Sequence, residues 1–80
     1  MTRRDKLIAR IRARPPEADF NDVRAVLEAF GYHDRGGKGS HHVFVKEGSP
    51  PVTVPTVGGR RVKRHYLDKL CELLELDEME

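Results

Sequence analysis

A glycine-rich stretch followed by two histidines is the part of this 80-residue chain whose residue types could carry out chemistry. The stretch runs from Gly36 to Ser40 and leads directly into His41 and His42. Histidine has the side-chain pKa nearest to neutrality, so one residue can accept a proton and donate it again. RNA supplies its own nucleophile, the 2′-hydroxyl beside each phosphate, so a positioned histidine with nearby cations could cleave RNA without a metal. The simpler alternative is a flexible hairpin turn that carries two exposed histidines.

The two histidines are neighbours in a predicted strand, so their side chains point to opposite sides of the sheet. His41 has the same parity as Val43 and Val45. His42 has the same parity as Phe44. Alternation therefore leaves open which imidazole faces the helix-free side of the sheet, where we expect RNA to lie, and both histidines are candidate catalytic residues.

Basic residues are concentrated around this stretch, although the formal net charge of the whole chain is only +2. Residues 31–65 contain seven of the 15 Lys and Arg residues but only two of the 13 Asp and Glu residues. Clustered basic side chains attract phosphate backbones at long range, which favours a nucleic acid as the partner. The alternative is a solvated surface of mixed charge.

The other residues that bind metals or act as nucleophiles form no recognisable site. No His-x₃₋₅-His ligand spacing exists among the four histidines, which are His33, His41, His42 and His65. The single cysteine, Cys71, cannot form an internal disulfide. Its acidic neighbours would raise the pKa of the thiol, which disfavours Cys71 as a nucleophile. We therefore expect the Cys71 side chain to pack in the core, on the buried side of the last helix. We therefore expect no metal and no cofactor.

Hydrophobic spacing predicts the elements that must position the histidines. Helices are expected where apolar residues recur with a period near 3.6, over residues 3–13, 20–30 and 63–76. Strands are expected in short β-rich runs, over residues 32–35, 41–45 and 52–54. The short gaps between these runs indicate antiparallel hairpins. The order α-α-β-β-β-α predicts a two-layer α+β domain, with a three-stranded antiparallel sheet and helices on one face.

Length and hydropathy limit the class of protein. The chain predicts one domain over residues 1–80, with a core at about 3–76 and a frayed tail at 77–80. So small a domain has a thin core, which excludes a deep pocket or a large buried cofactor. Its apolar runs are far shorter than the ~18 residues that a membrane span needs, and no signal peptide is recognisable. We therefore expect a soluble cytoplasmic protein with no membrane partner.

The stretch from Lys38 to Phe44 resembles the Gly-Ser-His-His signature of HicA-family toxins, the mRNA interferases of type II toxin–antitoxin systems. The strand Val52-Thr53-Val54-Pro55 is similar to the Thr-Val-Pro strand of that family. The first helix is similar to the one that a longer branch of the family carries. The resemblance covers residues 3–76.

This resemblance implies a double-stranded-RNA-binding-like fold, endoribonuclease activity on mRNA and inhibition by a HicB-like antitoxin protein. The catalytic histidine of the family maps to His41, with His42 as the competing assignment. Gly39 and Ser40 would shape the turn that presents it. The RNA-phosphate contacts would be made, by position and charge, by Lys38, Arg60, Arg61 and Lys63.

The sequence departs from the family pattern after Thr-Val-Pro, where many members have x-His and this chain has Thr56-Val57. If that histidine assists cleavage, activity is weakened here, and we do not expect His65 to replace it. Two alternatives follow from this departure and from the charge pattern. One is a non-catalytic RNA-binding module of the same fold. The other is a protein-interaction domain whose basic patch binds an acidic antitoxin surface.

Overall fold

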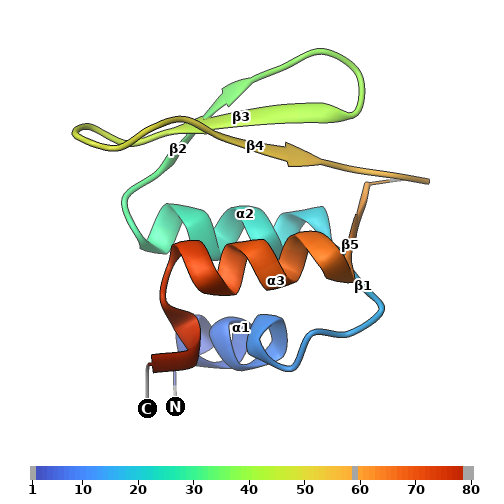
Figure 1. The fold of residues 1–80 in the computed structure, drawn as a ribbon, viewed down its shortest axis with the longest axis vertical. Coiled ribbons are helices and arrows are strands. Elements are labelled where there is room, and N and C mark those ends of the chain that lie inside the picture. The colour runs from blue at the N-terminus through green and yellow to red at the C-terminus, as the bar shows by residue number, and fades with distance from the viewer. Residues whose placement is uncertain (1, 59, 79–80) are drawn as a thin grey trace.

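The computed structural model describes residues 2–58 and 60–78, which form three α-helices, five short strands and a final 3-10 turn (Figure 1). The helices are α1 (Arg3–Arg12), α2 (Phe20–Ala29) and α3 (Arg64–Leu73), and the 3-10 turn is η1 (Leu76–Glu78). The strands are β1 (Glu17–Asp19), β2 (His33–Gly36), β3 (His41–Val45), β4 (Val52–Pro55) and β5 (Arg61–Lys63). Every predicted helix and strand is therefore present.

Strands β2, β3 and β4 form an antiparallel sheet in the order β2-β3-β4. Phe44 pairs with Val52 and His42 pairs with Val54, so these four side chains share one face. Phe44, Val52 and Val54 on that face are buried. Helices α2 and α3 cover this face, and α1 packs beneath them on the side away from the sheet (Figure 1). The α+β class with all helices on one face of the sheet is confirmed, with α1 as an added layer.

Each helix buries one apolar side, which explains why it forms. Helix α1 starts with a capping box, in which Thr2 and Asp5 exchange hydrogen bonds of 3.2 Å between side chain and backbone. The Asp19 carboxylate caps α2 by accepting a hydrogen bond from the Asn21 amide at 2.7 Å. The buried side chains of the helices form one continuous core with the inner face of the sheet. Of the helices in the described ranges, none has the length and apolarity to cross a bilayer.

Strands β1 and β5 form a second, two-stranded antiparallel sheet that the sequence did not predict. Ala18 pairs with Val62, and these are the buried residues of the two strands. Charged residues flank each of them, so each strand alternates over only three residues, which is shorter than the about four to eight residues that identify a strand from sequence. Because β1 leads directly into α2 and β5 into α3, this pairing brings the starts of the two helices together.

Arg14 connects the end of α1 to the end of the chain. Its guanidinium donates to the carboxylate of Asp68 on α3 at 2.5 Å and to that of Asp77 in η1 at 2.6 Å. Arg14 has φ +50°, and its carbonyl accepts a hydrogen bond from Arg64 at 2.9 Å. Asp77 and Glu78 thus belong to η1, and the last two residues of the frayed tail predicted at 77–80 lie outside the described ranges.

Candidate nucleic-acid interface

One end of the molecule, which we call the loop end, gathers most of the predicted site residues. We define it as residues 36–42, 56–58 and 60–63 with the first turns of α2 and α3. Figure 1 shows the turn between β2 and β3, the end of β4, and the starts of both helices on this side. The positive ends of two helix dipoles therefore face the same region as the basic loop residues. Helix α3 starts at Arg64 with no acidic residue in its first turn.

The backbone around the glycine-rich turn is held from both sides. The carbonyl of Ser40 accepts hydrogen bonds from the Thr56 amide at 2.7 Å and from the Thr56 hydroxyl at 3.2 Å. The amide of His41 donates to the carbonyl of Lys38 at 3.1 Å, which closes the turn. A Cβ added to Gly37 would lie 1.9 Å from the carbonyl oxygen of His41, so only glycine fits there. The turn therefore has a defined shape at the point where β3 begins.

His41 and His42 lie on opposite faces of β3, as alternation requires. His41 is exposed, and it alternates with the residues of the buried face, His42 and Phe44, so it lies on the face opposite the helices. His42 is half-buried on the helix-facing side, and its imidazole stacks on the Phe20 ring with centroids 4.3 Å apart and an interplanar angle of 33°. Neither ring is sealed beneath the helices, so both stay accessible in part to a polynucleotide.

Arg60 lies on the same aromatic ring as His42. Its guanidinium carbon is 4.9 Å from the centroid of Phe20, within the range of a cation–π contact. The carbonyl of Arg60 accepts a hydrogen bond from the Phe20 amide at 3.0 Å. Arg60 is exposed and has φ +75°, in the left-handed region that residues with a side chain rarely adopt. Strained residues of this kind concentrate at functional sites.

The other residues predicted to contact phosphates are Lys63, Arg61 and Lys38, and they differ in their surroundings. The Lys63 ammonium lies 2.9 Å from the carboxylate of Glu17, and this ion pair lowers the pKa of Glu17. Lys63 is thus partly neutralised by its own chain. Arg61 is exposed on β5, where its backbone pairs with Val57 in both directions at 2.8 Å. Lys38 is exposed at the tip of the glycine-rich turn.

His42 and Arg60 therefore both contact the Phe20 ring, whereas the exposed imidazole of His41 lies on the opposite face of β3. Among the residues of β2, β3 and β4, all of which the structure describes, the only Lys or Arg is Arg35. The helix-free face of the sheet, where we expected RNA, is poor in cations. Sequence reasoning did not connect Phe20 with the site, because its spacing matched the core pattern of the helix over residues 20–30. The sequence signal that could have pointed to Phe20 is an aromatic residue directly after the Asp19 helix cap. Its contact with the strand that carries His42 is visible in the structure.

A family model for the HicA toxin of bacterial toxin–antitoxin systems matches residues 20–76, which is more than half of the chain. The chain belongs to the HicA toxin family. Members of this family are toxins that generally cleave RNA, and membership implies an antitoxin as a protein partner. No curated protein and no solved structure matches the chain.

The match to the HicA family begins at Phe20, the residue on which His42 and Arg60 lie. All residues of the loop end are inside it, whereas α1 and β1 precede it. Val57, which takes the place of the histidine that many HicA proteins have after Thr-Val-Pro, is 43% exposed. Thr56 before it is buried and holds Ser40, so its role here is structural.

Of the other chemically capable side chains of this HicA protein, Cys71 lies outside the loop end, whereas His65 in the first turn of α3 belongs to it. Cys71 is buried in α3, where burial raises the pKa of its thiol. In residues 2–58 and 60–78, no group of three or more His, Cys, Asp or Glu side chains is arranged to hold a metal ion. His65 is exposed in the first turn of α3.

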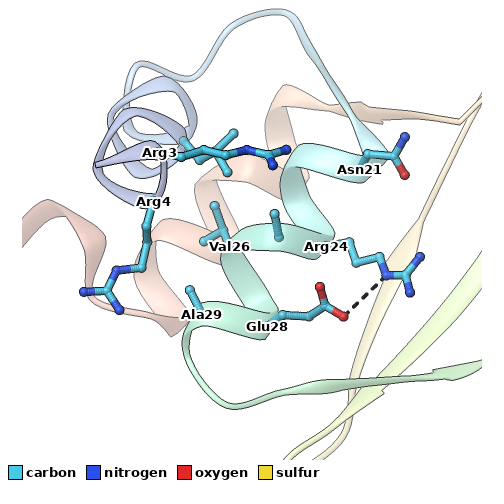
Figure 2. Close-up of a pocket in the computed structure, with 9 residues that line it drawn as sticks. Arg3, Arg4, Asn21, Arg24, Val26, Glu28 and Ala29 are labelled. Carbon is cyan, nitrogen blue, oxygen red and sulfur yellow. Dashed lines mark ion pairs between the residues drawn. The ribbon is translucent and has the colours of Figure 1, made fainter. Parts of the chain in front are cut away.

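A separate groove of about 440 Å³ lies between α1 and α2, away from the histidines (Figure 2). Arg3 extends over this groove toward α2, and Arg24 forms an ion pair with Glu28 at 3.6 Å on its far side. Two residues of its floor, Leu7 and Val26, are already buried by the fold. The acidic residue among those that line the groove, Glu28, is paired with Arg24, and the α1 wall of the groove lies outside the HicA match.

Proposed function

We propose that this protein is a metal-independent endoribonuclease toxin, an mRNA interferase, with His42 as its general base and Arg60 as its main phosphate contact. The observation that carries the proposal is the shared contact of both side chains with Phe20, at 4.3 and 4.9 Å. A proton acceptor and a fixed positive charge on one ring are the two groups that cleavage of RNA by its own 2′-hydroxyl needs.

The proposed reaction is an internal transfer of the phosphodiester. The imidazole of His42 takes the proton of a 2′-hydroxyl, and the 2′-oxygen attacks the adjacent phosphorus. The bond to the 5′-oxygen of the next nucleotide breaks, and that oxygen takes a proton from solvent. The products are a 2′,3′-cyclic phosphate and a 5′-hydroxyl. The guanidinium of Arg60 stabilises the negative charge that develops on the phosphate oxygens.

The distribution of positive charge supports His42 as the general base. The family resemblance had favoured His41. The strand residues around His41 include Val43 and Thr53 on the same exposed face, and they offer no positive charge. Both histidines lie at the loop end, but it is the imidazole of His42 that contacts Phe20, the ring on which the Arg60 guanidinium also lies. A bound phosphate would therefore be held beside His42 and not beside His41.

The RNA path that we propose runs over the loop end. Arg60 and Arg61 hold successive phosphates, with smaller contributions from Lys38 and Lys63, while Gly39 and Ser40 shape the turn that bounds the path. A HicB-like antitoxin in the cytoplasm would inhibit this protein by covering the same end. These assignments follow from position and charge.

A second candidate function is an RNA-binding module that does not cleave. Val57 favours this alternative, because it is exposed at the loop end where many family members have a histidine. Under this alternative Val57→His would create cleavage in a protein that has none. Under our proposal the parent protein cleaves, and Val57→His changes the rate without being required.

The experiment is incubation of the purified protein with a single-stranded RNA in EDTA, with analysis of the product ends. We expect cleavage that leaves 2′,3′-cyclic phosphate ends. His42→Ala should abolish cleavage, and His41→Ala, the matched variant on the exposed face, should retain most of it. Loss of cleavage in His41→Ala with retention in His42→Ala would reverse the assignment. Salt-dependent binding of intact RNA by the parent would select the non-catalytic module.

A further inference from the structure

We propose that Phe20 is a positioning residue for RNA cleavage, and that its ring aligns the imidazole of His42 and the guanidinium of Arg60 relative to each other. This inference rests on the proposed function. It assigns a role in the reaction to a side chain that is itself fully buried and cannot touch RNA.

The Phe20 ring is held rigidly enough to act as such a platform. The backbone amide of Phe20 donates a hydrogen bond to the carbonyl of Arg60 at 3.0 Å. Phe20 is also the first residue of α2, directly after the Asp19 cap. On the inner side its ring packs against the ring of Phe44, with centroids 6.1 Å apart. Backbone, helix start and core packing therefore all restrict where the ring can lie.

The contacts on this ring fit the chemistry of the two groups it carries. An aromatic face attracts a guanidinium through its quadrupole. The same ring also packs against the imidazole of His42, with the two centroids 4.3 Å apart. The platform would therefore hold the imidazole of His42 in one orientation. It would also restrict Arg60, whose long side chain otherwise samples many rotamers.

Phe44 provides the matched control. It is the same residue type, it is also fully buried, and it packs against Phe20 in the same core. No aromatic or cation–π contact joins it to His42 or Arg60 in the described part of the chain. Phe→Leu at either position removes one aromatic ring from the core, so the two variants should lose similar stability. The two variants differ in one respect: the ring removed by Phe20→Leu contacts His42 and Arg60, and the ring removed by Phe44→Leu does not.

The experiment compares Phe20→Leu and Phe44→Leu in single-turnover RNA cleavage at saturating RNA, at a temperature where both are folded by circular dichroism. We expect Phe20→Leu to lower the cleavage rate about ten- to a hundredfold more than Phe44→Leu, the scale of a misaligned catalytic group. In the Arg60→Ala background, which retains measurable cleavage, Phe20→Leu should cause a smaller further loss than in the parent, because a positioning residue acts through the groups it positions.

Proton NMR of the histidine rings gives a readout that does not depend on activity. Stacking at 4.3 Å should shift the His42 ring protons upfield through the Phe20 ring current, with no such shift for exposed His41. Phe20→Leu should remove this shift, and Phe44→Leu should retain it. Equal effects of the two substitutions on rate, or on the His42 resonances, would overturn the inference. A parent protein that binds RNA but never cleaves it would instead overturn the proposed function, and the positioning role with it.

Discussion

Arg60 and Phe20 are joined twice, once through the backbone and once through the side chains. The Arg60 carbonyl accepts a hydrogen bond from the Phe20 amide at 3.0 Å, and the Arg60 guanidinium lies 4.9 Å from the Phe20 ring centroid. Arg60 keeps this position at φ +75°, where glycine would be unstrained. A loop that needed only to connect β4 and β5 would gain from glycine here, so the arginine points to a function.

We therefore predict that Arg60→Gly separates stability from activity. The relief of backbone strain offsets the lost cation–π contact and the added chain entropy, so the free energy of unfolding should stay within about 1 kcal/mol of the parent. The RNA cleavage rate should fall about a hundredfold, the scale of removing one donor to the transition-state charge. Denaturant unfolding and single-turnover cleavage measure the two effects.

Arg60→Lys is the control, because it keeps the positive charge and the backbone strain. It should retain more cleavage than Arg60→Gly while being no more stable. Full activity in Arg60→Gly would remove Arg60 from the site.

The ion pair between Lys63 and Glu17 predicts unequal contributions of the basic residues to RNA binding. Each phosphate contact on a single strand contributes about 0.7 to the slope of log K against log salt. Arg60→Ala should reduce this slope by about that amount. Lys63→Ala should reduce it less, because Lys63 already lies 2.9 Å from a carboxylate. Binding is measured with His42→Ala to prevent cleavage, and equal slopes for the two variants would contradict this ranking.

Gly37 and Gly39 are required for different physical reasons, so substitutions at the two positions should lower the free energy of unfolding by different amounts. A Cβ at Gly37 meets the carbonyl oxygen of His41 at 1.9 Å, so Gly37→Ala must displace the start of β3 and should cost about 1–3 kcal/mol of stability. Gly39 has φ +58° and no neighbouring atom within 4 Å, so Gly39→Asn should cost under about 1 kcal/mol. Thermal unfolding compares the two, and equal losses would mean that the turn adapts to the Gly37 side chain.

The fold could be predicted from sequence wherever burial repeats over several residues. Helices α1 and α2 begin and end within one residue of the predicted ranges, and β3 has the predicted bounds. Strands β1 and β5 were missed because each contributes one buried residue, Ala18 or Val62, between charged neighbours. Their pairing is a tertiary contact between distant segments, and no local pattern encodes it.

The candidate site could be predicted as a list of residues but not as an arrangement. The sequence identified His41, His42 and Arg60, whereas the choice of face depended on which side of β3 the helices cover. Phe20 matched the core pattern, and it is indeed fully buried. Its contacts with His42 and Arg60 arise from the β1–β5 pairing, which brings the start of α2 beneath β3.

Helix α1 lies outside the HicA match, but its burial predicts that the fold depends on it. Ile11 is fully buried and belongs to the same core as Phe44 and Leu67. Ile11→Ala should therefore cost about 2–5 kcal/mol of stability. Urea unfolding gives this value, and a loss below about 1 kcal/mol would mean that α1 is dispensable for the core.

The ion pair between Arg14 and Asp77 predicts a stability contribution that depends on pH. The hydrogen bond from Arg14 lowers the pKa of Asp77 below its ordinary value of 3.8, so the folded protein binds that proton less readily than the unfolded chain. The stabilisation is then complete above pH 3.8 and is lost as the pH falls through the lowered pKa of the folded state. The melting temperature of the parent should exceed that of Asp77→Asn by a constant amount between neutral pH and about pH 5, and the difference should shrink below pH 3.8. It should also be smaller in 1 M salt, because the Asp77 side chain is 54% exposed and the Arg14 side chain 30% exposed, and the Debye length falls to about 3 Å. A difference that persists unchanged at pH 2 would show that Asp77 stabilises the turn by packing and not by its charge.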